Sequence, residues 1–297
     1  MWEFLTEFPA MGRRDLSEFK KAVDEAFKGF TRTYGEALEN FFDPLLKFLV
    51  GLEKLLLATP WPLILILVGG LAWLGSRSWK ITIPSVLAFV AIGILDMWEE
   101  TMATLAIISV ATLLCIVIGI PIGILMARSN RAQAIVTPIL DIMQTIPSFV
   151  YLIPVVMLLG IGKVPGLLAV CIYALPPIVR LTNLGIRLVD KDVLEAADAF
   201  GASPRQKLWG VQVPLALPNI FAGVNQTIMM ALSMVVIASM IGVKGLGKPV
   251  LQAVSNQYLA QGLLFGLAIV ALAIIFDRVS QAYGKRLQNY RTGHGND

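Results

Sequence analysis

The stretch EAADAFGASPRQKLWGVQVPLALP, from Glu195 to Pro218, interrupts an otherwise apolar part of the chain. It is polar and basic, and long apolar runs precede it up to about residue 184 and follow it from about residue 220. A charged segment of this length in so apolar a chain predicts a structured loop on which another molecule docks. The flanking runs then decide the fold, because they must hold this loop at a membrane face.

The composition predicts an all-α, polytopic membrane protein. Hydrophobic residues make up 57% of the chain and charged residues 15%, whereas a soluble domain carries about 25% charged residues. Several runs approach the roughly 20 apolar residues that cross a bilayer as a helix, and the short alternating segments of a transmembrane β-barrel are absent. About seven transmembrane helices are expected, over residues 55–74, 81–95, 102–126, 135–160, 164–184, 220–241 and 259–276.

The distribution of charge divides the chain into four regions. Residues 1–54 form an N-terminal amphipathic segment, which either lies along the membrane interface or packs on a partner as a soluble helical tail. Residues 55–100 hold two accessory transmembrane helices. Residues 101–280 form a five-helix core that contains the polar loop (residues 190–214), and residues 281–297 form a polar tail.

The basic residues predict the orientation in the membrane. One face would hold Arg77, Lys80, Arg128, Arg131, Arg187, Lys191, Arg205, Lys207, Arg278, Lys285, Arg286 and Arg291. Apart from the N-terminal segment, the other face would hold only Lys163, Lys244 and Lys248. Short loops rich in Lys and Arg remain in the cytoplasm. The polar loop and the C-terminus are therefore expected in the cytoplasm, and the N-terminus outside.

Several kinds of chemistry are excluded by the residues at hand. Cys115 and Cys171 lie inside apolar runs, which argues against a structural disulfide, and no metal-binding spacing occurs. The only histidine, His294, belongs to a polar tail, so histidine-based catalysis or metal binding within the membrane is excluded. The first residues lack a basic region followed by a long apolar core, and no cleaved signal peptide is expected.

The polar loop has strong local signals of its own. Glu195 is predicted to open a short helix that Gly201 ends, because glycine is the usual residue just past a helix. Ser203 is predicted to cap a second short helix, from Pro204 to about Trp209, with Gln206 completing a capping box. Two capped helices make a rigid protrusion. Its basic residues would serve either a protein partner or anionic lipid head groups.

The residues Glu195, Ala196, Ala197, Gly201 and Pro214 stand in an order that resembles the EAA signature of permease subunits in bacterial ABC importers. The similarity covers about residues 101–286 and is closest to the glycine betaine/proline/choline branch of that family. It is carried by DIMQTIPSFVYLIPVVMLLGIGKVPG (141–166), ALPPIVRLTNLGI (174–186), FGASPRQ (200–206) and AGVNQTIMMALSMVVIASMIG (222–242). The first hundred residues carry little of it, although this branch tends to have an extended N-terminal region.

The resemblance implies a translocation subunit of the bacterial cytoplasmic (inner) membrane without an ATPase site of its own. In the family this loop is a coupling helix that sits in a groove of a cytoplasmic ATPase subunit. The residues to which this assigns a coupling role are Glu195, Ala196, Ala197, Gly201, Ser203, Pro204, Arg205 and Lys207. It further implies a second copy of the chain and a secreted or periplasmic substrate-binding protein, with no nucleic-acid partner. ATP and Mg²⁺ would bind the ATPase subunit, and no cofactor is expected in this chain.

A second motif has the appearance of a nucleotide site. Residues 242–249, GVKGLGKP, match the start of a phosphate-binding P-loop. That loop follows a strand and needs Ser or Thr after its Lys to hold Mg²⁺. Here Pro249 occupies that position and an apolar span precedes the motif. We therefore expect an external turn, one that a binding protein could touch.

Polar residues within the spans are costly in a bilayer, so they face either a cavity or a neighbouring helix. Asp141 and Gln144 lie in the fourth span, and Asn225 and Gln226 begin the sixth. Each would line the path of a zwitterion or hydrogen-bond between helices, and the sequence leaves both open. Gly119 and Gly123 have the spacing for close helix packing.

Two functions from different classes remain. The first is the permease of an ATP-driven importer for compatible solutes such as glycine betaine, proline betaine, choline or carnitine, as the resemblance implies. The second is a stand-alone secondary transporter or channel for small zwitterions, which would show an intramembrane ionisable pair or inverted repeats. Only Asp141 is expected well inside a span, and no repeat is evident. The first function is therefore favoured.

Overall fold

The computed structural model describes residues 10–291 and the side chains of residues 10–284, which form helices and their connections without a strand. The predictions for His294 and for residues 292–297 of the tail concern residues outside the described range. The α-helices are α2 (Arg13–Ala58), α3 (Trp61–Ser76), α4 (Trp79–Ile94), α5 (Trp98–Arg128), α6 (Asn130–Thr145), α7 (Leu152–Leu159), α8 (Lys163–Arg187), α9 (Lys191–Ala199), α10 (Pro204–Lys207), α11 (Val213–Ala238), α12 (Gly247–Asn256) and α13 (Leu259–Arg291). Short 3₁₀ helices cover Ser148–Tyr151 and Ser239–Ile241, and a π-helix covers Leu208–Gln212.

Within residues 10–291, four helices are long and apolar enough to cross a membrane by themselves, namely α5, α8, α13 and the continuous helix Pro204–Ile241 that contains α11. Two further spans are possible only as bent pairs, and α4 is a shorter apolar helix of 16 residues. The fold class is thus confirmed as all-α and polytopic. Against the expected seven or so transmembrane helices, the described residues hold four such spans by length and composition, or six when each bent pair counts as one span.

The fourth predicted span is broken in the middle. Helix α6 ends at Thr145, and the chain then turns by 106° into the segment Ser148–Leu159. Ile146 has an extended backbone (φ −64°, ψ 129°) and precedes Pro147. The residue before a proline is restricted to extended conformations, so the helix cannot continue through this position.

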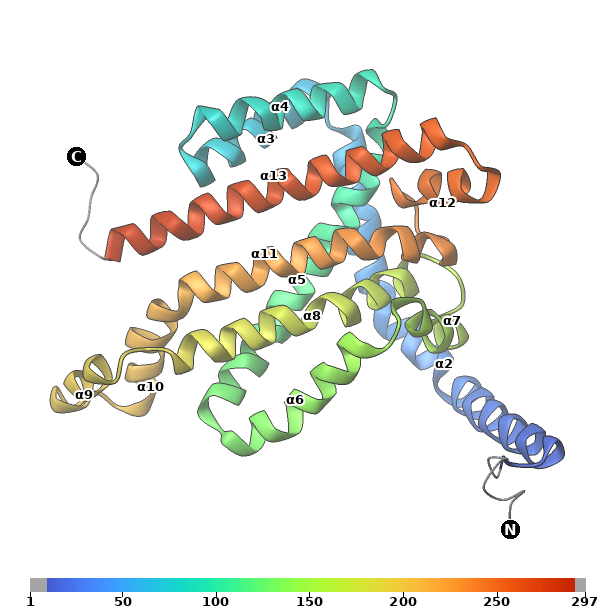
Figure 1. Cartoon of the computed structure of the whole chain (residues 1–297), viewed down its shortest axis with the longest axis horizontal. Coiled ribbons are helices and arrows are strands. Elements are labelled where there is room, and N and C mark those ends of the chain that lie inside the picture. Colours follow the sequence, from blue (N-terminus) through green and yellow to red (C-terminus); the bar gives the residue numbers. More distant parts are fainter. Residues whose placement is uncertain (1–9, 292–297) are drawn as a thin grey trace, which may run out of the picture.

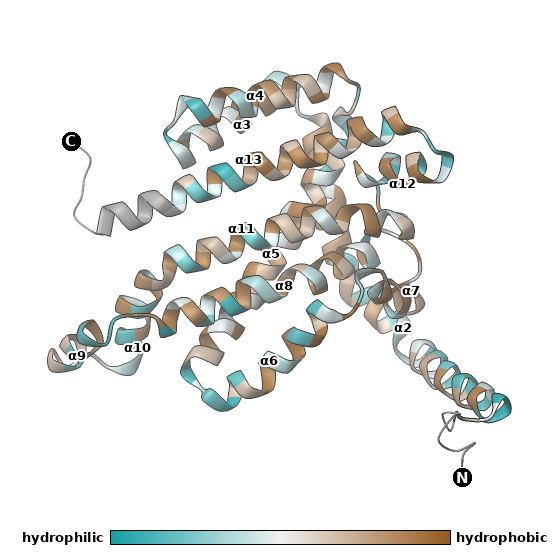
Figure 2. Ribbon diagram, viewed as in Figure 1, coloured by the Kyte–Doolittle hydropathy of each residue, from teal (hydrophilic) through white to brown (hydrophobic). Residues whose placement is uncertain are grey.

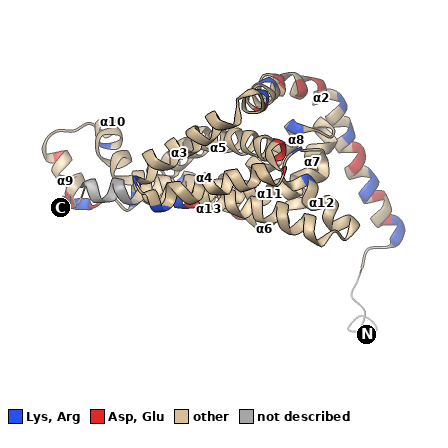
Figure 3. Cartoon of the chain, turned by 90° about the horizontal axis from the view of Figure 1, so that it is seen from above, with Lys and Arg blue, Asp and Glu red and all other residues tan. Residues whose placement is uncertain are grey.

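The same physical cause separates α2 from α3, which meet at 109°. Thr59 is extended and precedes Pro60. As a result α2 crosses one end of the bundle instead of running parallel to it (Figure 1). Lys and Arg alternate with Asp and Glu along the outer part of α2 (Figure 3), and most of its residues are exposed. Its second half contacts the bundle: Gly35 lies close to Leu158 of α7, Leu49 is buried, and Glu53 forms an ion pair with Lys163 of α8.

Helices α5, α8 and α11 supply much of the buried apolar core, whereas hydrophilic residues are frequent in α9, α10 and the outer part of α2 (Figure 2). Gly119 and Gly123 of α5 lie directly against α8, which confirms their predicted packing role. A Cβ atom at Gly123 would lie 2.7 Å from the backbone oxygen of Val179. Small residues therefore set the distance between these helices.

The bundle is elongated, with different elements at its two ends. Helices α9 and α10 lie at one end, toward which the last turns of α13 also point (Figure 1). Helices α7 and α12 lie at the opposite end, together with the start of α8. The start of α6 joins the end of α8 through a hydrogen bond from Arg187 Nη2 to Asn130 Oδ1 (2.9 Å). The polar loop therefore projects from the end of the bundle at which the predicted cytoplasmic turns gather.

Candidate functional site

Helix α9 forms the first half of the polar loop. It begins at Lys191 and not at Glu195, because Asp190 caps it by accepting a hydrogen bond from the backbone N–H of Asp192 (2.9 Å). An aspartate at this position satisfies an N–H that the helix leaves free. Glu195 thus lies in the middle of the helix, and both it and Ala196 are exposed. The predicted helix start was wrong because the Asp190 cap was overlooked.

The turn after α9 follows the predicted pattern. Gly201 has a φ of +76°, a conformation that glycine adopts without the penalty of a side chain. The backbone N–H of Gly201 bonds to the carbonyl of Asp198, and that of Ala202 to the carbonyl of Ala197 (3.0 Å). These bonds satisfy carbonyls that the helix end leaves free. The turn is therefore well defined, and it points α10 in a new direction.

The predicted capping box is confirmed at the start of α10. The backbone N–H of Ser203 donates to Gln206 Oε1 (2.8 Å), and that of Gln206 donates to Ser203 Oγ (3.4 Å). Lys207 Nζ then reaches back to both carboxylate oxygens of Asp198, at 2.7 and 2.8 Å. This ion pair ties α10 to α9, so the two short helices form one unit.

The second short helix does not end at Trp209 as predicted. It passes through the π-helix Leu208–Gln212 into α11, so that Pro204–Ile241 is one continuous helix. Inside a helix a proline removes one N–H donor and its ring crowds the carbonyl of the preceding turn, and the π-helix Leu208–Gln212 directly ahead of Pro214 accommodates both. The consequence is mechanical: a force on α10 passes directly into a transmembrane helix.

The surface of this unit combines charge with large exposed apolar side chains. Phe200 is 93% exposed and Trp209 is 62% exposed, and Val193 and Leu188 also face outward. Glu195 and Arg205 are exposed beside them. Exposed aromatic residues within a charged rim are typical of a protein-binding surface. We name the exposed residues of 188–209 the docking surface.

Asp141 of α6 forms an ion pair with Arg180 of α8, with Asp141 Oδ1 and Arg180 Nη2 separated by 2.5 Å. The prediction that Asp141 is the only ionisable residue well inside a span was wrong, because Arg180 lies inside α8. Arg180 was overlooked because it directly follows the apolar run ALPPIV. Gln144 is exposed one turn further along α6.

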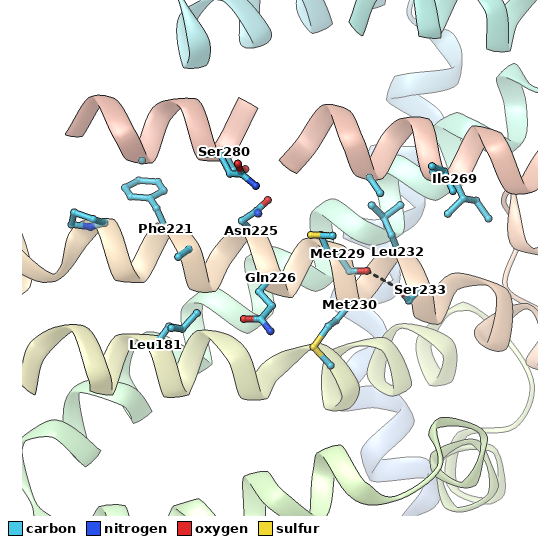
Figure 4. A pocket seen from close by; sticks show the side chains of 16 residues that line it. Leu181, Phe221, Asn225, Gln226, Met229, Met230, Leu232, Ser233, Ile269 and Ser280 are labelled. Atoms are coloured by element: carbon cyan, nitrogen blue, oxygen red, sulfur yellow. Dashed lines mark hydrogen bonds between the residues drawn. The ribbon is translucent and has the colours of Figure 1, made fainter. Parts of the chain in front are cut away.

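Asn225 and Gln226 line a groove of about 790 Å³ between α11 and α13. Figure 4 shows Asn225 directed toward α13 and Gln226 toward α8. Asn225 Nδ2 donates to Asp277 Oδ1 of α13 (2.8 Å), which also accepts from Gln281 Nε2 (2.7 Å). Asp141 and Gln144 do not line this groove. The four polar residues therefore fall into two separate pairs.

The P-loop-like segment is a turn between two helices. The 3₁₀ helix Ser239–Ile241 precedes it, and its last glycine opens α12. Inside the turn the backbone N–H of Leu246 donates to Thr104 Oγ1 of α5 (2.8 Å). The backbone N–H of Leu246 thus fixes the turn to the helix core and is not available to bind a phosphate.

Comparison with known proteins identifies the family. The family described as "Binding-protein-dependent transport system inner membrane component" matches residues 119–289. Across 274 residues the chain is 44% identical to the glycine betaine/carnitine transport permease protein GbuB of Listeria monocytogenes, covering 90% of this chain and 95% of that protein. It is 52% identical over 235 residues to the glycine betaine/proline betaine transport system permease protein ProW of Escherichia coli, covering 79% of this chain but only 66% of ProW.

Solved structures show the same fold. The inward-facing MetNI methionine ABC transporter aligns with a TM-score of 0.57 at 22% identity, covering 62% of this chain and 93% of that chain. An amino acid ABC transporter crystallised with histidines aligns with a TM-score of 0.55 at 20% identity, covering 67% and 97%. This chain belongs to the family of binding-protein-dependent transport system inner membrane components, and is a multi-pass protein of the inner membrane.

Proposed function

We propose that this chain is the permease subunit of an ATP-driven importer for glycine betaine or related zwitterionic and quaternary-ammonium osmolytes. The named relatives are permeases of glycine betaine systems, with proline betaine or carnitine as further substrates. The observation that carries the proposal is the docking surface, which is exposed, rigid and continuous with a transmembrane helix.

An ATPase subunit is the partner that this surface suits. Its contacts would be made by the coupling residues Glu195, Ala196, Ala197, Gly201, Ser203, Pro204, Arg205 and Lys207. Phe200 and Trp209 would be buried on binding, as aromatic anchors often are. Movement of the ATPase would displace α10 and, through the continuous helix Pro204–Ile241, the membrane core. ATP and Mg²⁺ would bind the ATPase, and this chain would need no cofactor.

The orientation and assembly complete the proposal. The end with the polar loop and C-terminus would be cytoplasmic and the N-terminus external, in line with the basic residues of the turns. Two copies would surround a shared path, and a substrate-binding protein would deliver the osmolyte to the external end. Protein and lipid would be its only macromolecular contacts, without nucleic acid. Asp141, Gln144, Asn225 and Gln226 are candidates for the path.

A stand-alone secondary transporter is the second candidate, and one observation favours it. The Asp141–Arg180 ion pair is the kind of intramembrane ionisable pair that ion-coupled transporters use. The two candidates differ in their energy source. An importer needs ATP and its ATPase subunit, whereas a secondary transporter needs an ion gradient.

Uptake of radiolabelled glycine betaine into proteoliposomes decides between them. The vesicles contain the permease with its ATPase subunit and binding protein. We expect uptake only when ATP is present on the side of the membrane that the ATPase subunit faces. The rate of uptake should not change when ionophores collapse the ion gradients. Uptake that persists without ATP and stops with the ionophores would overturn the importer and support the secondary transporter.

A further inference from the structure

The Asp141–Arg180 pair lies deep along both helices that carry it. At about 1.5 Å per residue, Arg180 lies roughly 10 Å along α8 from Arg187, and Asp141 roughly 16 Å along α6 from Asn130. These two helix ends are joined by the hydrogen bond between Arg187 and Asn130. The pair therefore sits well inside a bilayer whose apolar core is about 30 Å thick.

The pair is exposed on the surface of the single chain. The side chain of Asp141 is 55% exposed and that of Arg180 is 40% exposed. Charges at this depth do not face lipid, because leaving water for hydrocarbon is too costly, and they border a water-filled path or another protein chain. Gln144 and Thr145, three and four residues after Asp141, are also exposed and share its face of α6. This face is a polar strip inside the membrane.

Arg180 keeps unused hydrogen-bonding capacity. Its guanidinium has five N–H donors, which bind a carboxylate through two parallel hydrogen bonds. Asp141 is held through Nη2, whereas the buried Nε has no hydrogen-bond partner among the described residues. The bond to Asp141 is the one hydrogen bond that this guanidinium forms among the described residues, and because 40% of the side chain is exposed, a second carboxylate can reach its outer N–H donors.

Asp141 stands where a positive charge is favoured. It lies in the last turn of α6, which ends at Thr145 because of the break at Ile146. The carbonyl end of a helix carries partial negative charge, and this adds to the charge of the carboxylate. A quaternary ammonium has no N–H to donate, so it is held by negative charge and by aromatic faces instead of hydrogen bonds.

We propose that the Asp141–Arg180 pair is a transfer site for zwitterions, an inference that rests on the proposed function and names the substrate class of its path. The carboxylate of the substrate replaces Asp141 on Arg180, and its ammonium faces the released Asp141. Each charge keeps an opposite partner throughout, so the exchange leaves no unpaired charge in the membrane. A purely cationic solute would leave Arg180 unpaired and is disfavoured.

The test uses the complete complex in proteoliposomes and three variants: Asp141→Asn, Arg180→Gln and the double variant. We expect all three to lower the maximal rate of glycine betaine uptake by about tenfold or more. The half-saturating concentration should change little, because the binding protein sets it. Amounts in the membrane and association with the ATPase subunit should stay normal in the double variant. Arg180→Lys, which keeps the charge without the planar fork, should be intermediate.

The double variant separates this proposal from a structural ion pair. If the pair only ties α6 to α8, each single variant leaves one charge unpaired and is harmful, while the double variant transports normally. Normal uptake by the double variant, or by all three, overturns the proposal. Neutralising Asp43 and Lys47, an exposed ion pair on α2, is the matched control and should leave uptake unchanged. A wild-type complex without ATP-driven uptake would instead contradict the proposed function.

Discussion

Gly123 in the helix core and Gly201 in the polar loop show how differently the two regions are stabilised. At Gly123 a Cβ atom would lie 2.6 Å from Thr182 Cβ and 2.7 Å from the backbone oxygen of Val179. At Gly201 a Cβ atom would meet nothing within 4 Å, and only the positive φ requires glycine. The core is thus held by close contact between helices, whereas the loop is held by its own hydrogen bonds and stays open to a partner.

The largest effect on folding is expected for Gly123→Ala. Because the neighbouring backbone cannot move away, the added methyl group should destabilise the permease by about 1–3 kcal/mol. Thermal unfolding of the purified protein in detergent measures this. Gly70→Ala in α3 is the matched control, since a Cβ there has open space. An unchanged unfolding temperature for Gly123→Ala would show that the α5–α8 contact is looser than described.

Glu195→Lys should affect coupling and leave folding intact. The side chain is exposed on α9, so the unfolding temperature should not change. If the docking surface seats the ATPase subunit, a reversed charge there should lower ATP-driven uptake by about tenfold or more. Glu36→Lys makes the same charge change on the exposed side of α2 and should transport normally. Normal uptake and normal binding of the ATPase subunit by the Glu195→Lys variant would contradict the coupling role proposed for Glu195.

Gly201→Ala should have a smaller and local effect. A residue with a side chain pays about 1–2 kcal/mol for the left-handed conformation, which should raise hydrogen exchange in residues 198–204. Gly201→Asn should destabilise the turn less than Gly201→Ala, because asparagine adopts the left-handed conformation more readily. Hydrogen exchange followed by mass spectrometry resolves the segment. Equal exchange in all three proteins would mean that the turn does not depend on the glycine.

The smallest effect is expected for Lys207→Gln, which removes the ion pair between α10 and α9. Asp198 is 55% exposed, and pairs this open to water contribute about 0.2–1 kcal/mol. We expect slightly faster exchange in α9 at low salt and no difference at high salt, because salt screens such pairs. A large loss of protection would show that the loop depends on this pair more than on its caps.

The local structure of the loop was largely predictable. The Ser203–Gln206 capping box and the glycine turn at Gly201 depend on residues within a few positions of each other. The start of α9 was missed although its signal was available, since Asp190 is an ordinary helix cap. The continuity of α10 with α11 was not predictable from Pro214, because an interior proline usually breaks a helix and the π-helix Leu208–Gln212 that accommodates it here has no signal in the sequence.

The polar residues of the spans were recognisable as unusual, yet their partners were not. Asp141 and Arg180 are 39 positions apart, and Asn225 and Asp277 are 52 positions apart. Their contacts depend on which helices are neighbours and on how each is rotated. Neither quantity is set by local sequence.

The membrane location, the approximate spans, the polar loop and the family resemblance follow from the sequence alone, because hydrophobic length, capping residues and short motifs act locally. The change of direction after α6, the continuity of α10 with a transmembrane helix and the contact of Asp141 with Arg180 depend on how the helices pack in three dimensions. The physical reason is the packing of α5, α8 and α11 at distances set by small residues such as Gly123. That packing fixes the rotation of each helix, and with it the partner of every polar side chain in the membrane.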